Sequence, residues 1–284
     1  MTGSPTDRDR LLGRAERMRV HRAGRGESEL DLVAVEEPLE IRFAGKTVAV
    51  VMRTPGDDPR LALGYLFGEG VIQSAADVEA VFRAGAPGPD GYGDVIDVSP
   101  TVEARIDAQR LEAATRRRGL TTSACGVCGR STVEDLLAGT PPVPAGPALP
   151  AARVAAAVEA LRTVQPLFDA TGGAHCAALF TRDGALVAAH EDVGRHNAVD
   201  KVVGALLVAR AKGEAIDAAV LAVSGRAGFE IVQKAARAGI PVVGSVSAPT
   251  SLAVALAREA GLALAGFVRG ARMNVYSAPE RIVL

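Results

Sequence analysis

Apolar and polar positions alternate through the first third of the chain in a pattern typical of strands. Residues 32–53 alternate on both sides of Ala44-Gly45-Lys46, which predicts a β-hairpin turning at those three residues. A helix is expected from Pro59 to Glu69, because apolar side chains recur on successive turns and Gly70 follows the last of them. Two more strands are expected at residues 95–99 and 101–107.

Beyond residue 150 the pattern alternates between helical and strand periods. A hairpin is expected over residues 174–190, turning at Arg182-Asp183-Gly184. The other expected elements are helices at 151–164, 197–212, 228–238 and 250–260, and strands at 218–223, 240–244 and 262–268. Such alternation predicts an α/β fold with helices packed on a largely parallel sheet.

Composition divides the chain into four segments. Residues 1–30 are rich in Arg with little apolar patterning, which is typical of a flexible arm. Residues 31–138 form a smaller β-rich N-terminal region that also holds the CxxC motif and the helix expected after it. The Pro-rich stretch 139–150 is incompatible with continuous helix and is interpreted as a linker. Residues 151–284 then form the α/β main domain.

The overall charge balance narrows the function classes. The 284-residue chain has a formal net charge of -1 at pH 7, which argues against a general nucleic-acid binder. It contains neither an apolar run of the roughly 20 residues needed to cross a bilayer nor the apolar stretch of a secretory signal. We therefore expect a cytoplasmic protein that binds neither nucleic acid nor membrane.

Cys125 and Cys128 form the motif with the clearest chemistry. Ser131 and Glu134 follow as a helix-starting capping box, so the cysteines precede a helix N-terminus, and Arg130 adds positive charge. Both effects favour the thiolate, which can accept and carry a persulfide sulfur while the neighbouring thiol assists the exchange.

Half of a zinc site is the alternative interpretation of this motif, and spacing alone does not separate the two. The remaining ligands would have to come from scattered residues, and no second CxxC or HxxxH is present. The pattern of zinc deaminases, H-x-E ahead of P-C-x-x-C, is also missing from the sequence. No metal site is assigned. The scattered candidates are His21, His175, Cys176, His190 and His196.

A cluster of polar residues lies at 191–197, between an expected strand and an expected helix. It includes Glu191, Asp192, Arg195, His196 and Asn197, at the end of a strand where open α/β sheets place ligands. A capping network that holds backbone N–H groups explains the same residues equally well.

Two residues in the preceding expected strand are weaker candidates for a functional site. Cys176 lies in an apolar strand and is interpreted mainly as a small core residue. His175 beside it is a weak candidate for a site, and a structural role is at least as plausible.

Three turns that follow expected strands resemble anion-binding sites. They comprise Ser224, Gly225 and Arg226, then the turn around Ser247, and finally Phe267, Val268, Arg269, Gly270, Ala271 and Arg272. The first two lead into helix N-termini, where free N–H groups favour anions, and the arginines can bind phosphate in a bidentate manner. Individually each turn is also an ordinary βα connection, and neither a Walker A motif nor a strand-linked GxGxxG accompanies them. Together they suggest a large anionic ligand.

Six sequence blocks in order show a family resemblance over residues 30–284. The blocks are CGVCG, TGGAHCAALF, HEDVGRHNAVDKVVG, VSGRAGFEIVQKAARAGIPVV, SAPTSLAVALA and FVRGARMNVYS. In these blocks the chain resembles the FdhD family of formate dehydrogenase accessory sulfurtransferases. The resemblance implies a main domain with a three-layer, cytidine deaminase-like fold.

The same resemblance implies a function. A cysteine desulfurase would donate sulfur to Cys125 as a persulfide, with Cys128 as partner. The sulfur would then pass to a bis(molybdopterin guanine dinucleotide) molybdenum cofactor, bound in part by Phe267 to Arg272, for use by formate dehydrogenase. The resemblance further implies a cytoplasmic homodimer. An alternative is a non-catalytic chaperone that binds the molybdenum cofactor and delivers it.

Overall fold

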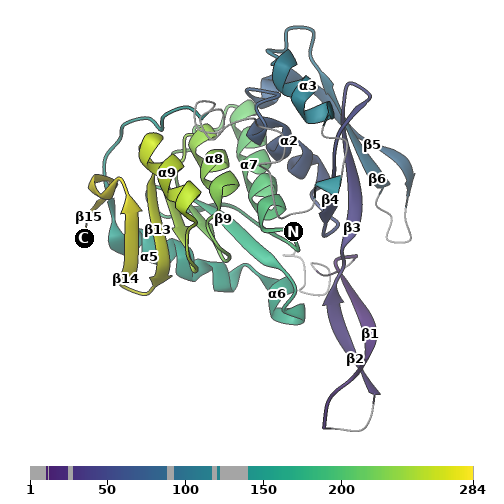
Figure 1. Cartoon of the computed structure of the whole chain (residues 1–284), viewed down its shortest axis with the longest axis horizontal. Coiled ribbons are helices and arrows are strands. Elements are labelled where there is room, and N and C mark those ends of the chain that lie inside the picture. Colours follow the sequence, from purple (N-terminus) through teal and green to yellow (C-terminus); the bar gives the residue numbers. More distant parts are fainter. Residues whose placement is uncertain are drawn as a thin grey trace, which may run out of the picture.

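The main domain is built on a six-stranded mixed sheet with the order β10-β9-β11-β12-β13-β14 (Figure 1). The computed structural model describes residues 11, 13–24, 28–87, 93–116, 120–121 and 140–283. The three central strands β11, β12 and β13 are parallel, and the outer strands pair antiparallel. The strands are β9 (His175–Thr181), β10 (Leu186–Asp192), β11 (Ala218–Val223), β12 (Val242–Ser245), β13 (Ala263–Arg269) and β14 (Arg272–Ser277).

Helices cover both faces of this sheet and make three layers. Helix α5 (Ala151–Ala160) packs on one face in a cluster that includes Cys176 and Phe180. The opposite face carries α7 (Arg195–Ala211), α8 (Phe229–Arg237) and α9 (Ser251–Glu259). Alternate residues of the strands enter the two apolar clusters, as expected for a sheet buried on both sides.

The N-terminal region forms a second sheet of five strands with the order β5-β6-β3-β4-β7. Helix α2 (Asp58–Gly68) packs against α7 of the main domain and joins the two sheets through one apolar cluster. The other elements of this region are β3 (Glu37–Phe43), β4 (Lys46–Arg53), β5 (Val78–Pro87), β6 (Gly93–Pro100), α3 (Ala108–Arg116) and β7 (Leu120–Thr121).

Short elements complete the fold. The end of the Pro-rich stretch forms β8, which pairs in parallel with β15 near the C-terminus. These elements are η1 (Ala75–Asp77), β8 (Leu149–Pro150), η2 (Leu161–Thr163), α6 (Pro166–Thr171), η3 (Pro279–Arg281) and β15 (Ile282–Val283).

Most predicted elements are confirmed, with three differences. The main sheet, predicted as largely parallel, is mixed: tight turns join β9 to β10 and β13 to β14, and strands joined in this way pair antiparallel. Residues 101–107, predicted as a strand, lie in turn and irregular backbone, since β6 ends at Pro100 and Asp107 accepts a hydrogen bond from Arg110 N at the start of α3. Residues 15–34, expected in large part as a flexible arm, form the antiparallel hairpin of β1 (Ala15–His21) and β2 (Ser28–Ala34), which projects from the body. Cross-strand pairing of Arg22 with Glu29 and Asp31 contributes to this hairpin.

Among the residues that the structure describes, no helix is both long and apolar enough to cross a membrane. The cytidine deaminase likeness stays a prediction, whereas the α/β, three-layer arrangement of the main domain is observed.

Candidate functional site

The three turns predicted to bind an anion meet at the carboxyl edge of the parallel strands. Ala227 N donates to Ala248 O over 3.2 Å, and Phe267 N donates to Ser247 O over 3.1 Å. Ser245 Oγ donates to Gly225 O over 2.7 Å, which ties the first turn to the second. These bonds hold turns that are distant in sequence as one edge, where ligands bind in open α/β sheets.

Two cavities open at this edge, and Arg269 lines both. The first encloses about 670 Å³ and includes Ser224, Val268, Arg269 and Gly270 of the predicted residues. The second encloses about 530 Å³ and includes Phe267, Arg269, Ala271 and Arg272. Each volume is in the range of small-molecule sites, so the two can hold parts of one extended ligand.

The remaining predicted residues support these cavities rather than line them. Gly225, Arg226 and Ser247 belong to the hydrogen-bonded turns beside the cavities, where Arg226 is exposed and the other two are partly buried. A Cβ atom on Gly225 would lie 3.1 Å from His175 Nδ1, so the absence of a side chain there leaves room for the imidazole.

Part of the first cavity wall comes from residues to which the sequence pattern assigned no role. Arg162, Gln165 and Phe168 line it from the end of α5 to the short helix α6, which had not been predicted. Six residues beginning with Pro give too short a periodic signal to identify a helix.

His175 lines the first cavity among positively charged neighbours. Burial, together with the Arg195 and Arg226 guanidinium groups, lowers the pKa of His175, and Asp192 only partly opposes this. Arg195 Nε is buried without a hydrogen-bond partner among the described residues. The positive charge of the Arg195 and Arg226 guanidinium groups makes this edge suited to an anionic group.

Phe267 adds an exposed aromatic ring to the second cavity. Its φ of 54° lies in the left-handed region, which is uncommon for a bulky residue, and 45% of the residue is exposed. The β13–β14 pairing shifts register between Gly266 and Arg269, which accounts for the local bend. Strained backbone of this kind is frequent at binding sites.

The cluster at 191–197 forms a capping network, and it also joins the two parts of the chain. Asp192 Oδ1 accepts from Gly194 N at 2.8 Å and from Asn197 Nδ2 at 2.9 Å. Asp192 Oδ2 accepts from Thr54 N at 3.2 Å and pairs with Lys201 Nζ at 2.7 Å. Fully buried, this carboxylate therefore connects the end of β4 to the start of α7.

Neighbouring residues of this cluster and of β9 also have structural roles. Glu191 accepts the N–H groups of Leu167 and Phe168 and so caps α6. Cys176 is 2% exposed in β9, and burial raises the pKa of its thiol to about 12. Such a thiol is unsuited to nucleophilic chemistry, which agrees with its interpretation as a core residue.

Cys125 and Cys128, the predicted sulfur-carrying pair, lie outside the described residues, as do Arg130 and the capping box after them. Residue 140 is the first described residue that follows them.

Comparison with known proteins identifies the family. The FdhD/NarQ family model matches residues 34–283. The chain is 57% identical over 258 residues to the sulfur carrier protein FdhD of Anaeromyxobacter dehalogenans strain 2CP-C, covering 89% of each chain. It is 47% identical over 285 residues to the sulfur carrier protein FdhD of Streptomyces coelicolor, covering 97% of each.

A solved structure agrees with this result. A crystal structure described as a candidate formate dehydrogenase accessory protein from Desulfotalea psychrophila is similar with a TM-score of 0.72 and 30% identity, covering 96% of this chain and all of that one. The chain therefore belongs to the FdhD/NarQ family, as the resemblance of its sequence blocks indicated.

Proposed function

We propose that this protein is a sulfur carrier that delivers sulfur to a molybdenum cofactor for formate dehydrogenase. Its relatives are named sulfur carrier proteins, and the similar crystal structure is described as a formate dehydrogenase accessory protein. A cysteine desulfurase is the donor, formate dehydrogenase the recipient, and the carrier acts as a cytoplasmic homodimer.

Sulfur enters by persulfide exchange. The Cys125 thiolate attacks the outer sulfur of the donor persulfide, so that R–S–SH and Cys125–SH become R–SH and Cys125–S–SH. Cys128, three residues away, assists the exchange. The third cysteine takes no part, because the pKa of the Cys176 thiol is about 12.

Binding of the molybdenum cofactor is supported by one observation, the cationic sheet edge with its two cavities. Bis(molybdopterin guanine dinucleotide) molybdenum cofactor, the substrate here, combines several phosphate groups with aromatic rings. Arg269, shared by both cavities, and Arg272 offer guanidinium forks to phosphate. The exposed ring of Phe267 offers a stacking surface to a base.

Mass spectrometry tests the sulfur-carrying role. After incubation with a cysteine desulfurase and cysteine, the wild type is expected to gain one sulfur, and Cys125→Ala is expected to gain none. Cys128→Ala separates the carrier from its partner, because it removes the second thiol without removing Cys125. If no form gained sulfur, the protein would instead be a cofactor-binding chaperone.

Substitution of Arg269 tests the binding edge. Arg269→Ala is expected to weaken binding of guanosine diphosphate, used as a probe for part of the cofactor, by about tenfold to a hundredfold, since hydrogen bonds to charged groups contribute about 1.5 to 3 kcal/mol. Titration calorimetry measures the affinity. Arg17→Ala, on the exposed face of β1, is the matched control and should bind like the wild type. Equal affinity of the Arg269 variant would place the nucleotide elsewhere.

A further inference from the structure

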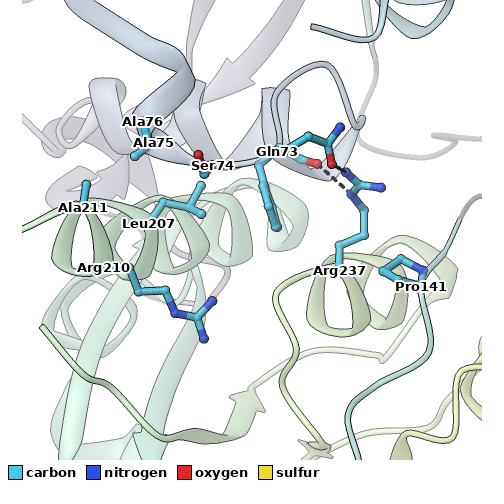
Figure 2. A pocket seen from close by; sticks show the side chains of 10 residues that line it. Gln73, Ser74, Ala75, Ala76, Pro141, Leu207, Arg210, Ala211 and Arg237 are labelled. Carbon is cyan, nitrogen blue, oxygen red and sulfur yellow. Dashed lines mark hydrogen bonds between the residues drawn. The ribbon is translucent and has the colours of Figure 1, made fainter. Parts of the chain in front are cut away.

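A third cavity lies where the C-terminal ends of α2, α7 and α8 meet, and it shares no lining residue with the two at the sheet edge. It encloses about 340 Å³. Phe67 and Leu207 form part of an apolar wall, Pro141 stands at one side, and Arg210 and Arg237 contribute guanidinium groups (Figure 2). Its described lining contains two arginines and no acidic residue.

Contacts with the protein hold both arginines in place. Arg237 Nε donates to Phe67 O over 2.8 Å, and Nη2 donates to Gln73 Oε1 over 3.4 Å, as Figure 2 shows. The Arg237 guanidinium also lies 5.3 Å from the centroid of the Phe67 ring. Arg210 Nη1 donates to Ala238 O over 3.1 Å. Ordered guanidinium groups lose little freedom when they bind an anion.

Capping of helix C-termini explains part of this arrangement, because Phe67 O and Ala238 O are such carbonyls. Desolvation lowers the pKa of Arg210, and none of the described carboxylates opposes this shift or forms an ion pair with it. A single carbonyl accepts from its five N–H groups within the described part of the chain. A bound carboxylate would complement the positive charge of this guanidinium.

The position of the cavity indicates what presents that carboxylate. Pro141 follows Cys128 by 13 residues, which span at most about 45 Å when fully extended, so the cysteine pair lies within that reach of the cavity. A protein that exchanges sulfur with the pair must approach this part of the chain. The cavity is at the small end of the range for ligand sites and suits a side chain and its neighbour better than a large metabolite. Arginines beside an aromatic ring are typical anchors of protein interfaces.

We propose that this cavity is a docking site for the sulfur donor, in which Arg210 and Arg237 bind an acidic side chain carried next to an apolar one on the desulfurase surface. This inference rests on the proposed function, because it assumes that the donor is a protein. It assigns recognition of the donor to a surface separate from the cofactor-binding edge.

Two substitutions test the docking site by different routes. Arg210→Glu reverses a charge in the cavity. Ala76→Glu places a carboxylate at the exposed edge of the same cavity and removes none of the capping hydrogen bonds, so it tests the site even if Arg210→Glu fails to fold. Lys212→Glu is the matched control: it reverses an exposed charge two residues from Arg210, on a side chain outside the lining.

The rate of persulfide formation is measured with two sulfur donors. With a cysteine desulfurase and cysteine at low carrier concentration, Arg210→Glu and Ala76→Glu are expected to load at least about tenfold more slowly than the wild type, as expected for truncated or repelled interface anchors. Lys212→Glu should stay within about twofold. With inorganic polysulfide, which needs no docking, all four proteins should load equally.

Calorimetric binding of the desulfurase gives a readout that does not depend on sulfur transfer. The docking site would be overturned if both cavity variants took sulfur from the desulfurase, and bound it, as well as the wild type does. It would also be overturned if the cavity variants loaded slowly from polysulfide, because the defect would then not depend on docking. If the wild type took sulfur from neither donor, the proposed function would fail. In that case the docking site would still be supported if the desulfurase bound the wild type but neither cavity variant.

Discussion

Replacing Asp192 with Ala is expected to lower the free energy of unfolding by about 3 to 5 kcal/mol, because it leaves a buried cation without its partner. Asp192 is fully buried and Lys201 is 1% exposed, and their ion pair spans 2.7 Å. The substitution also removes the acceptor of Thr54 N, Gly194 N and the Asn197 side chain. Chemical denaturation monitored by circular dichroism measures the loss.

A double-mutant cycle shows whether the unpaired charge causes this loss. Asp192→Asn keeps the shape but not the charge, and should remain strongly destabilised. Adding Lys201→Met removes the stranded ammonium and should recover part of the stability, since replacing both partners of a buried pair is often tolerated. Arg22→Ala, in the exposed pair with Glu29, should cost less than about 1 kcal/mol. A similar cost for Asp192→Ala would contradict the structural role given to this carboxylate.

Replacing Gly204 with Ala is expected to destabilise the protein by about 3 kcal/mol, at the upper end of overpacking effects. Helices α2 and α7 touch through backbone at this position, and a Cβ on Gly204 would lie 2.0 Å from Arg60 O. The same happens at Gly64, whose Cβ would lie 1.9 Å from Asp200 O. A side chain could change rotamer to relieve such a contact, but a helical backbone carbonyl cannot, so the two helices would have to separate.

Helix propensity sharpens the test, because Ala favours a helix over Gly by about 1 kcal/mol. A lower melting temperature for Gly204→Ala would therefore show that the steric clash between the added Cβ and Arg60 O outweighs the higher helix propensity of Ala. Gly228→Ala is the control, since no atom lies within 4 Å of its added Cβ, and it should cost at most about 1 kcal/mol as a change at a helix cap. A neutral or stabilising Gly204→Ala would mean that α2 and α7 do not pack this closely.

The sequence alone led to the α/β architecture of the main domain and the approximate limits of its regular elements. Helix 197–212 and strand 218–223 are examples, observed as Arg195–Ala211 and Ala218–Val223. Periodicity and turn residues are local properties, so they can be read along the chain. The family also followed from sequence, because six ordered blocks are visible without coordinates. The chemistry of Cys125 and Cys128 rests on sequence as well.

Only the tertiary structure decided which distant residues meet. It placed the turns at 224–226, 247 and 267–272 along one edge, put His175 and part of α6 in the wall of the first cavity, and left Gly225 and Ser247 outside the cavity linings. It also showed that Asp192 bonds Thr54, a partner 138 residues away. The cavity with Arg210 and Arg237 arises in the same way, from the ends of three helices. Burial, charge compensation and cavity walls depend on contacts between remote segments, which periodicity does not encode.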